Sequence, residues 1–425
     1  MPERLSLHVE KPAAGGRMLA RHDGQIVFVS GALPGERVSV EVEQVRGGVI
    51  YARTAEVESA SPDRRDPSGD PSCGGSVYSH IAYPRQCALK GEIVVDAFRR
   101  IGRLPLGAAV PVRPSPEEGY RMRARLHVRG SRIGFFREGT HTLCDPAGSG
   151  QLLPQTIQVL QDLSERFSRS GVGAARELEL TENIPGRERA VLIELTPGAG
   201  KSSREVLASA DSPGLTGVLV VPVDEPDRTA SRGRPWVTDV LSLAAGAPDV
   251  TLRRHVASFF QGNRYLLEPL VRTVTGLIPE GAVVDLYAGA GLFGIACAAL
   301  GRAPVVAVEG ERHAAQDLEV NARPFGGAVQ VSASPVESFL SRGRVPAAAT
   351  LLVDPPRTGL SRTVAESLAS VDARRIVYVS CDVATLARDV RRLIDGGGYS
   401  LEHIEAFDLF PNTAHVETIA VLTRP

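Results

Sequence analysis

The chain has 425 residues, of which 43% are hydrophobic and 23% charged, and its formal net charge is −1. These values are ordinary for a globular protein, and the length suits two or three domains. They exclude a globally basic protein, although a local basic face stays possible. No apolar run reaches the roughly 18 residues of a membrane span, and the first residues, MPERLSLHVEKP, lack the apolar core of a signal peptide. We therefore expect a cytoplasmic protein that does not enter a membrane.

The number and spacing of the cysteines also suit a cytoplasmic protein. The five cysteines are Cys73, Cys87, Cys144, Cys297 and Cys381. They are too few and too scattered to predict a disulfide framework.

Residues 1–60 predict a small β-barrel. Short alternating apolar runs are separated by turn signals such as Asp23-Gly24 and Leu33-Pro34-Gly35. Strands at this spacing are typical of an OB-like barrel. The stretch 61–80 is rich in Pro, Asp, Ser and Gly at its start and indicates a linker.

Residues 81–257 predict a central α/β region. Apolar residues recur with helical spacing in 86–101, and Gly102 follows as a stop signal. Further on, Arg121, Arg123 and Arg125 alternate along a predicted strand and would point to one side. Such a row either contacts RNA phosphates or is an ordinary solvated sheet face, and this stretch alone does not decide between them.

Residues 258–425 predict a Rossmann-like domain. Apolar β-branched runs alternate with helical segments, as in AVVDLY, APVVAVEG, ATLLVDPPR, RRIVYVSC and TIAVLTRP. This alternation predicts a doubly wound parallel sheet with helices on both faces, so the fold class is α/β.

A glycine loop follows the first of these strands. Gly289, Gly291 and Gly294 fit the pattern G-x-G-x-x-G, and Glu309 ends the next predicted strand. Glycines let a backbone approach a ligand closely, and an acid at this spacing commonly accepts ribose hydroxyls. The loop predicts an adenosine-type cofactor, either NAD(P) or S-adenosylmethionine.

Three further strand ends carry reactive side chains. Asp354 comes directly after TLLV and is followed by two prolines and Arg357, a stiff turn that could grip the edge of a planar base. Cys381 lies between a strand and a helix, where a thiol pKa can be lowered, although most cysteines are inert core residues. Glu417 begins the last strand, where partial burial could make it a base.

These motifs together resemble one family. In chain order they are FFQGN (259–263), DLYAGAGLF, DPPR, SCDVATLARDV and FPNTAHVE. Their combination is similar to the signatures of the S-adenosylmethionine-dependent RNA uridine-5-methyltransferases. The N-terminal barrel resembles the TRAM module that many members of this family carry.

The resemblance implies a role for each matching residue. Cys381 would add to C6 of uracil, and Glu417 would remove the C5 proton after methyl transfer. Asp354 would bind the flipped uracil or the methionine end of the cofactor. S-adenosylmethionine would be bound by Gln261, Tyr287, Gly289 and Glu309. RNA would be bound by the barrel and by Arg121, Arg123 and Arg125.

The chain departs from the family at the cysteines. Many relatives hold an iron–sulfur cluster through a pattern like C-x5-C-G-G-C and a fourth cysteine further on. Here only Cys73 matches, while Pro67, Ser76 and Ser149 stand at the other three places. Two thiols at most cannot close a cluster, so we expect none and no other metal. Val383 also replaces a proline beside the nucleophile, which predicts a less rigid loop.

Three alternatives stay open at this point: another nucleic-acid C5 methyltransferase, a catalytically degenerate RNA-binding protein, and an NAD(P) oxidoreductase. Because Cys381, Asp354 and Glu417 are all present, they argue against a catalytically degenerate protein. Only the glycine loop would suit an NAD(P) oxidoreductase, and no other motif in the chain indicates hydride transfer. The TRAM-like barrel and the length favour large-subunit rRNA over tRNA as the substrate, and we expect a monomer.

Overall fold

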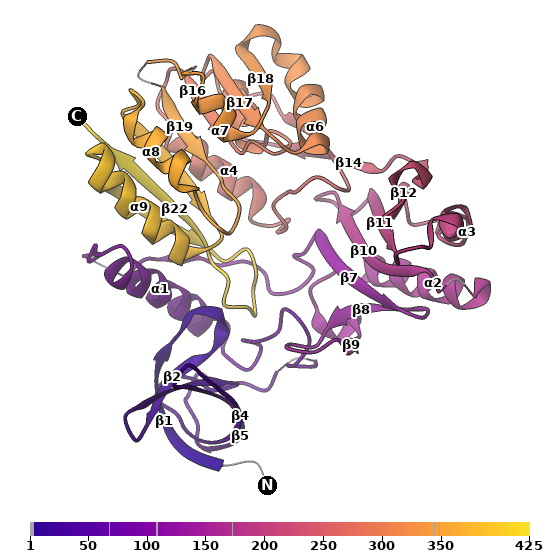
Figure 1. Ribbon diagram of the computed structural model, residues 1–425, viewed down its shortest axis with the longest axis vertical. Coiled ribbons are helices and arrows are strands. Elements are labelled where there is room, and N and C mark those ends of the chain that lie inside the picture. Colours follow the sequence, from indigo (N-terminus) through magenta and orange to yellow (C-terminus); the bar gives the residue numbers. More distant parts are fainter. Residues whose placement is uncertain (1–3, 68, 108, 172, 344, 348) are drawn as a thin grey trace.

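The structure is a computed structural model that describes residues 4–67, 69–107, 109–171, 173–343, 345–347 and 349–425. The chain runs from a barrel at one end, through a central sheet, to a large α/β layer that contains the C-terminus (Figure 1). Within the described ranges, no helix is long and apolar enough to cross a membrane.

The N-terminal strands close into a five-stranded barrel in the order β1-β2-β3-β5-β4. Their bounds are Arg4–Pro12 (β1), Met18–His22 (β2), Gln25–Ser30 (β3), Arg37–Arg46 (β4) and Val49–Ser59 (β5). Along β1 the residues alternate between exposed and buried, so one face of the strand fills the barrel. The predicted barrel is therefore confirmed.

The central part contains a seven-stranded sheet in the order β13-β12-β11-β10-β7-β8-β9 and a separate ribbon, β14-β15. The strands are Arg123–Arg129 (β7), Arg132–Phe136 (β8), Leu143–Cys144 (β9), Ala175–Glu182 (β10), Arg189–Leu195 (β11), Gly217–Pro222 (β12), Ala230–Gly233 (β13), Trp236–Leu241 (β14) and Val250–His255 (β15). Helices Pro154–Ser170 (α2) and Ser203–Ser209 (α3) belong to this part, and their apolar residues join one core with the sheet.

The C-terminal part is built on an eight-stranded sheet in the order β18-β17-β16-β19-β20-β22-β21-β6. Its strands are Val112–Arg113 (β6), Val283–Leu286 (β16), Val305–Glu309 (β17), Val329–Ala333 (β18), Thr350–Val353 (β19), Arg375–Ser380 (β20), Ser400–Phe407 (β21) and Glu417–Thr423 (β22). Its helices are Leu267–Gly276 (α4), Leu292–Ala299 (α5), Arg312–Ala322 (α6), Val336–Leu340 (α7), Arg362–Ser370 (α8) and Val383–Gly397 (α9).

The first five strands of this sheet run parallel, and the direction of strand order reverses beside β16. Separate cores on the two faces show that helices cover both sides. The predicted Rossmann-like sheet is thus confirmed, and β22, which runs antiparallel to both β20 and β21, extends it. Ligands bind at the carboxyl ends of the strands beside such a reversal.

Helix α1 (Tyr83–Arg100) and strand β6 lie within the region 81–257 that the sequence assigned to the centre. Nevertheless, β6 pairs with β21, and the apolar face of α1 packs into the same core as α9. Figure 1 shows α1 between the barrel and α9. The other expected domain boundaries stay predictions.

Candidate active site

Three strand ends bring the predicted catalytic residues to one edge of the sheet. Cys381 follows β20, and Asp354 follows β19, its parallel neighbour. Glu417 starts β22, which runs antiparallel to β20 with Ser380 opposite Thr418. This register places Cys381 beside Glu417. Glu417 is buried, and its Oε1 has no hydrogen-bond partner among the described residues.

The turn that carries Cys381 is held by side chains on both sides of it. The Ser380 hydroxyl accepts a bond from the Asp382 N–H at 3.2 Å, and the Asp382 carboxylate accepts one from the Thr385 N–H at 2.9 Å. Asp382 is thereby the N-cap of α9. Val383 is the first residue of that helix, a position where proline is also favoured.

Burial dominates the electrostatics of the three side chains. Burial and, to a smaller extent, the charges of Glu417 and Asp354 raise the pKa of the Cys381 thiol to about 12, and the nearby Arg357 opposes this rise. Burial also raises the pKa of Asp354 to about 7, opposed by a hydrogen bond from Gln261 at 3.4 Å. The pKa of Glu417 lies well above its ordinary value because of burial and of the nearby Asp354.

The glycine loop after β16 is closed by Glu309 at the end of β17. One Glu309 oxygen accepts the Gly289 N–H at 2.8 Å, and the other accepts the Glu311 N–H at 2.6 Å. Tyr287 has a φ of 63° and Gly289 one of 58°, so both are in the left-handed region. Positive φ is costly for tyrosine and is often kept at functional sites. A Cβ on Gly289 would meet only the Phe259 carbonyl, at 3.9 Å, so the loop leaves space for a ligand.

A groove of about 600 Å³ opens at Cys381. One wall comes from the C-terminal part and includes Arg357, Phe410 and His415. The central part contributes Arg121, Arg125, His127 and Phe136, and the N-terminal part contributes Gly15, Gly74 and Gly75. The Cys381 thiol therefore lies at a groove that residues from all three parts of the chain line.

Known proteins match both ends of the chain. Residues 346–425, which include Asp354, Cys381 and Glu417, match the tRNA (uracil-5-)-methyltransferase family, and residues 3–54 match the TRAM domain. An uncharacterized RNA methyltransferase of Streptomyces coelicolor is 32% identical over 99% of this chain and 93% of its own. The 23S rRNA (uracil(1939)-C(5))-methyltransferase RlmD of Methylococcus capsulatus is 31% identical over 99% of this chain and 97% of its own.

The chain belongs to the RNA uracil-5 methyltransferase family.

A solved member shares the overall structure. The Pyrococcus abyssi tRNA (uracil-54, C5)-methyltransferase, in complex with S-adenosyl-L-homocysteine, has a TM-score of 0.74 and 25% identity to this chain. The match covers 98% of this chain and 99% of that one. The family's fold, with barrel, central sheet and catalytic sheet, is thus present along nearly the whole length.

The expected basic row is split by its neighbours in the sheet. Arg123 and Arg125 both bind the Glu179 carboxylate on β10, and Arg125 also lies 3.8 Å from Glu177. These acids lie on another strand of the sheet and reduce the positive charge that the three arginines alone would give. Arg121 donates to the Gln151 side chain at 2.6 Å and lines the groove with Arg125. Their contact with RNA stays a prediction.

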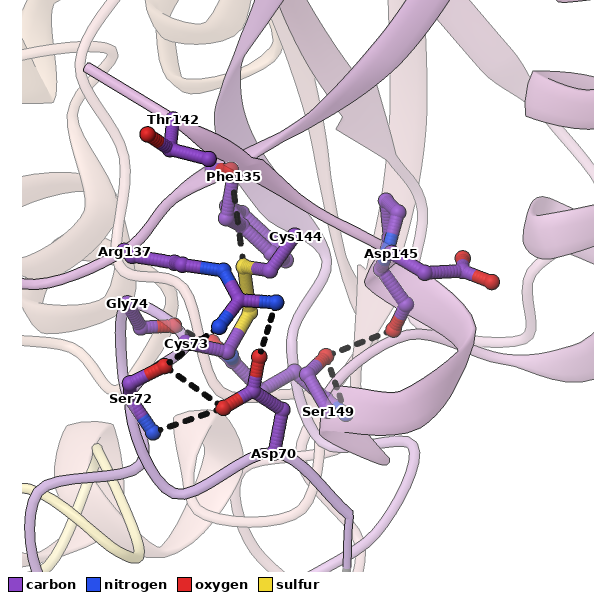
Figure 2. The surroundings of a disulfide bond; sticks show 12 residues. Asp70, Ser72, Cys73, Gly74, Phe135, Arg137, Thr142, Cys144, Asp145 and Ser149 are labelled. Atoms are coloured by element: carbon purple, nitrogen blue, oxygen red, sulfur yellow. Dashed lines mark hydrogen bonds and ion pairs between the residues drawn. A yellow bond between two sulfur atoms is a disulfide. The ribbon is translucent and has the colours of Figure 1, made fainter.

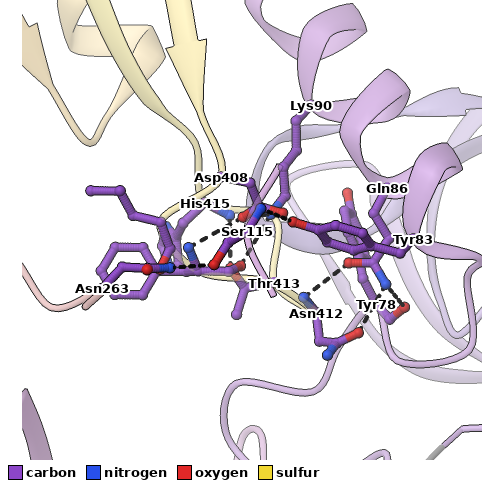
Figure 3. Close-up of polar contacts among 12 residues, drawn as sticks. Tyr78, Tyr83, Gln86, Lys90, Ser115, Asn263, Asp408, Asn412, Thr413 and His415 are labelled. Carbon is purple, nitrogen blue, oxygen red and sulfur yellow. Dashed lines mark hydrogen bonds and ion pairs between the residues drawn. The ribbon is translucent and has the colours of Figure 1, made fainter. Parts of the chain in front are cut away.

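The sequence also missed a polar network behind the groove, shown in Figure 3. The Lys90 ammonium on α1 donates to the Asp408 carboxylate at 2.5 Å and to the Phe410 carbonyl at 3.1 Å, with both ionic side chains fully buried. Gln86 exchanges two hydrogen bonds with Asn412, whose φ is 63°. The segment 408–416, which leads to Glu417, is therefore held by a helix more than 300 positions earlier.

The residues at the family's iron–sulfur positions do not fit a cluster. Cys73 and Cys144 form a disulfide, which Figure 2 shows between the 70–76 segment and β9. Pro67, Ser76 and Ser149 offer no thiolate. Within the described ranges, no group of three or more metal-binding side chains is found. The cysteine pattern, which predicted no disulfide framework, did not indicate this single bond, because folding brings together two cysteines 71 positions apart.

Arg357 was named from the sequence only as part of a stiff turn, and His415 and Asp285 were assigned no role. Arg357 and His415 line the groove together with Cys381. Asp285, in β16, accepts the Gly294 N–H at 2.8 Å, and burial raises its pKa to about 8. An acid inside an apolar strand just before a glycine loop is the signal that could have identified it.

Proposed function

We propose that this protein transfers a methyl group from S-adenosylmethionine to C5 of a uridine in RNA, through a covalent bond between Cys381 and C6. The observation that carries the proposal is the meeting of Cys381, Asp354 and Glu417 at one sheet edge that opens into the groove. The family and the S-adenosyl-L-homocysteine bound to the P. abyssi member support it.

The cofactor side of the site consists of Gln261, Tyr287, Gly289 and Glu309. Each Glu309 oxygen has a lone pair left after its bond to a backbone N–H, so the carboxylate can still accept ribose hydroxyls. The open backbone at Gly289 allows a ligand to approach. When bound, S-adenosylmethionine supplies an electrophilic methyl group on a sulfonium. Uracil C5 is too weakly nucleophilic to take this methyl group unaided.

Cys381 makes C5 nucleophilic. Its sulfur forms a bond to C6, and the electron pair of the C5–C6 double bond moves onto C5 and O4 as an enolate. The attack requires the thiolate, which the high pKa of Cys381 disfavours in the free protein. Arg357 is the nearby cation that favours the thiolate, and Asp354 is placed to bind an edge of the base.

Glu417 completes the reaction after C5 has taken the methyl group. Its carboxylate removes the C5 proton, the C–H electrons restore the C5–C6 double bond, and the Cys381 sulfur leaves with its bonding pair. A raised pKa makes Glu417 a stronger base than an exposed glutamate. The target base must leave its stack to reach this buried pair.

Large-subunit rRNA is the favoured substrate. Two relatives at 31% identity, from Methylococcus capsulatus and Thiobacillus denitrificans, are named 23S rRNA (uracil(1939)-C(5))-methyltransferases. The solved P. abyssi protein is named for a tRNA, so tRNA is the second arm of the test. We place the protein in the cytoplasm, where both RNAs occur, and expect it to act as a monomer.

The test incubates the purified protein with methyl-labelled S-adenosylmethionine and, separately, with rRNA and tRNA that lack 5-methyluridine. We expect label in 5-methyluridine of the rRNA. Label in tRNA alone would move the assignment to tRNA, and no label in either RNA would refute the function.

A second test addresses the covalent step. RNA that carries 5-fluorouridine at the target has no C5 proton for Glu417 to remove, so a protein–RNA adduct should accumulate. Mass spectrometry should locate that adduct at Cys381. Adduct formation or methyl transfer by Cys381→Ala would show that the assigned nucleophile is wrong; Cys87→Ala, at another partly buried thiol, is the matched control.

A further inference from the structure

A second hollow lies on the other side of the nucleophile turn, between the barrel and α1. It has a volume of about 350 Å³, within the range of small-molecule sites. It is lined by Lys11, Pro12, Ala13, Leu19, Ile26, Phe28, Ile93, Asp96, Ala97, Arg100, Ile101, Val383 and Ala384. We name it the barrel–helix hollow.

The barrel–helix hollow adjoins the active-site groove. Ile93, Val383 and Ala384 line both spaces. Val383 and Ala384 are the two residues that follow the Cys381-Asp382 turn. A chain that runs along the groove past Cys381 therefore reaches this hollow next.

The floor of the hollow is apolar and only partly covered. Leu19, Ile26 and Phe28 come from the barrel, and Ile101 at the end of α1 is 44% exposed. Phe28 lies 5.7 Å from the Tyr51 ring, which extends the aromatic surface over the barrel. Partly exposed aromatic and aliphatic side chains can stack against unpaired RNA bases.

The rim of the hollow is cationic. Lys11 and Arg100, which both line the hollow, lie 3.1 and 3.3 Å from the carboxylate of Asp96. Two positive charges of the lining thus share a single negative one, which leaves a net positive rim. An apolar floor under a positive rim complements a nucleotide, whose base is planar and whose phosphate is negative.

We propose that the barrel–helix hollow binds an unpaired nucleotide that neighbours the target uridine. This inference rests on the proposed function, since extruding one base unstacks its neighbours and leaves them without a partner. The hollow gives one such neighbour a place to stack, while its phosphate lies against Arg100 and Lys11. The subsite would hold the strand on the side of Cys381 that faces the barrel.

The test measures binding without requiring methyl transfer. The probe is a dye-labelled short oligouridylate, and its affinity is read by fluorescence anisotropy for the wild type and for Ile101→Asp. We expect roughly tenfold weaker binding, the usual effect of losing one stacked base. Val45→Asp is the matched control, because Val45 is a barrel residue that is 64% exposed and outside the hollow. Equal affinities for the wild type and Ile101→Asp would overturn the subsite.

Two further readouts distinguish a nucleotide in the hollow from RNA bound elsewhere on the protein. Arg100→Ala should lower the dependence of binding on salt by about one unit of slope, as expected for one lost phosphate contact. An oligouridylate with one 4-thiouridine should cross-link to peptides that contain Phe28 or Ile101. Cross-links confined to peptides of the groove, or a loss of self-association in Ile101→Asp, would instead show another occupant and refute the inference. A protein that binds in this way but fails to methylate RNA would refute the proposed function alone.

Discussion

Asp354 and Glu417 are two carboxyl groups that share one low-polarity site, so each makes ionisation of the other harder. Such an arrangement is poor for stability and useful for catalysis, because a base at neutral pH needs a raised pKa. The cost should be visible as a dependence of stability on pH.

We predict that Asp354→Asn abolishes most methyl transfer and yet raises the melting temperature at about pH 8. The pKa of Asp354 is raised from 3.8 to about 7, so the folded protein holds this proton more tightly than the unfolded chain does. The stability that this proton contributes is fully present when the pH is below 3.8, the pKa of the aspartate in the unfolded chain. It is lost as the pH rises through about 7, its pKa in the folded protein. The gain should therefore vanish near pH 4, where the wild-type carboxyl is neutral. Asp372→Asn, at an exposed site, should show no such difference; an equal shift at both pH values would contradict the raised pKa.

Arg357 offers a second test at the level of one residue. It opposes the raised pKa of both Cys381 and Glu417, so its removal should make the thiolate rarer. We expect Arg357→Gln to lower kcat on the order of 100-fold and to move the rate profile to higher pH. Arg362→Gln, at an arginine whose side chain is 86% exposed, serves as the control. A wild-type pH profile in Arg357→Gln would argue that this arginine binds RNA only.

At the scale of elements, α1 positions the segment that leads into β22. The Lys90 side chain on α1 donates to the Asp408 carboxylate and to the Phe410 carbonyl. The Gln86 side chain, on the same helix, accepts the Asn412 N–H, and the Tyr78 N–H, just before the helix, donates to the Asn412 carbonyl (Figure 3). This segment provides groove residues on one side and Glu417 at its end. Rigid placement of the base therefore depends on a helix that itself carries no reacting group.

We predict that Lys90→Met destabilises the protein by about 3–5 kcal/mol, because it leaves the Asp408 carboxylate buried without a counter-ion. The double variant Lys90→Met with Asp408→Leu should recover much of the melting temperature. It should still have a reduced kcat with an RNA KM near the wild-type value, since the Lys90 bond to the Phe410 carbonyl stays lost. Recovery of kcat together with stability would show that the ion pair has only a structural role.

Residues close in sequence were the ones that the sequence predicted well. The glycine loop and Glu309 lie twenty positions apart, and the ends of consecutive strands must meet at one sheet edge, so Asp354 and Cys381 could be placed together. The Glu179 partner of Arg123 and Arg125 comes from a strand that is not adjacent in the chain. Such partners depend on the order of the strands in the sheet, which local sequence patterns do not predict.

At the scale of the whole molecule, the groove exists only where the barrel, the central sheet and the catalytic sheet meet. The Cys73–Cys144 disulfide links the 70–76 segment, which includes the groove residues Gly74 and Gly75, to β9 of the central sheet. Next to it, Gly74 donates to the Phe136 carbonyl at 2.9 Å, and its own carbonyl accepts from the Gln151 amide, which in turn binds Arg121. The disulfide is thus connected to a groove arginine through two hydrogen bonds, from Gln151 to Gly74 and from Arg121 to Gln151.

We predict that the denatured, unreduced protein exposes three titratable thiols, Cys87, Cys297 and Cys381, and five after reduction. Cys73→Ser should lower the free energy of unfolding by about 2–5 kcal/mol, as for other native disulfides. Cys87→Ser, at a free cysteine, should change it much less. Five reactive thiols before reduction would disprove the bond.

The placement of β6 and α1 has a consequence for how this protein could be divided. Both elements precede the central sheet in the chain, yet they complete the catalytic sheet and its core. A fragment that starts at residue 258 would expose the outer edge of β21 and the apolar side of α9. Unpaired strand edges and bare apolar faces promote aggregation. We therefore expect that the fragment 258–425 does not fold as a stable, soluble domain. A fragment that also includes residues 83–113 would have the sheet edge and the core that it needs to fold by itself.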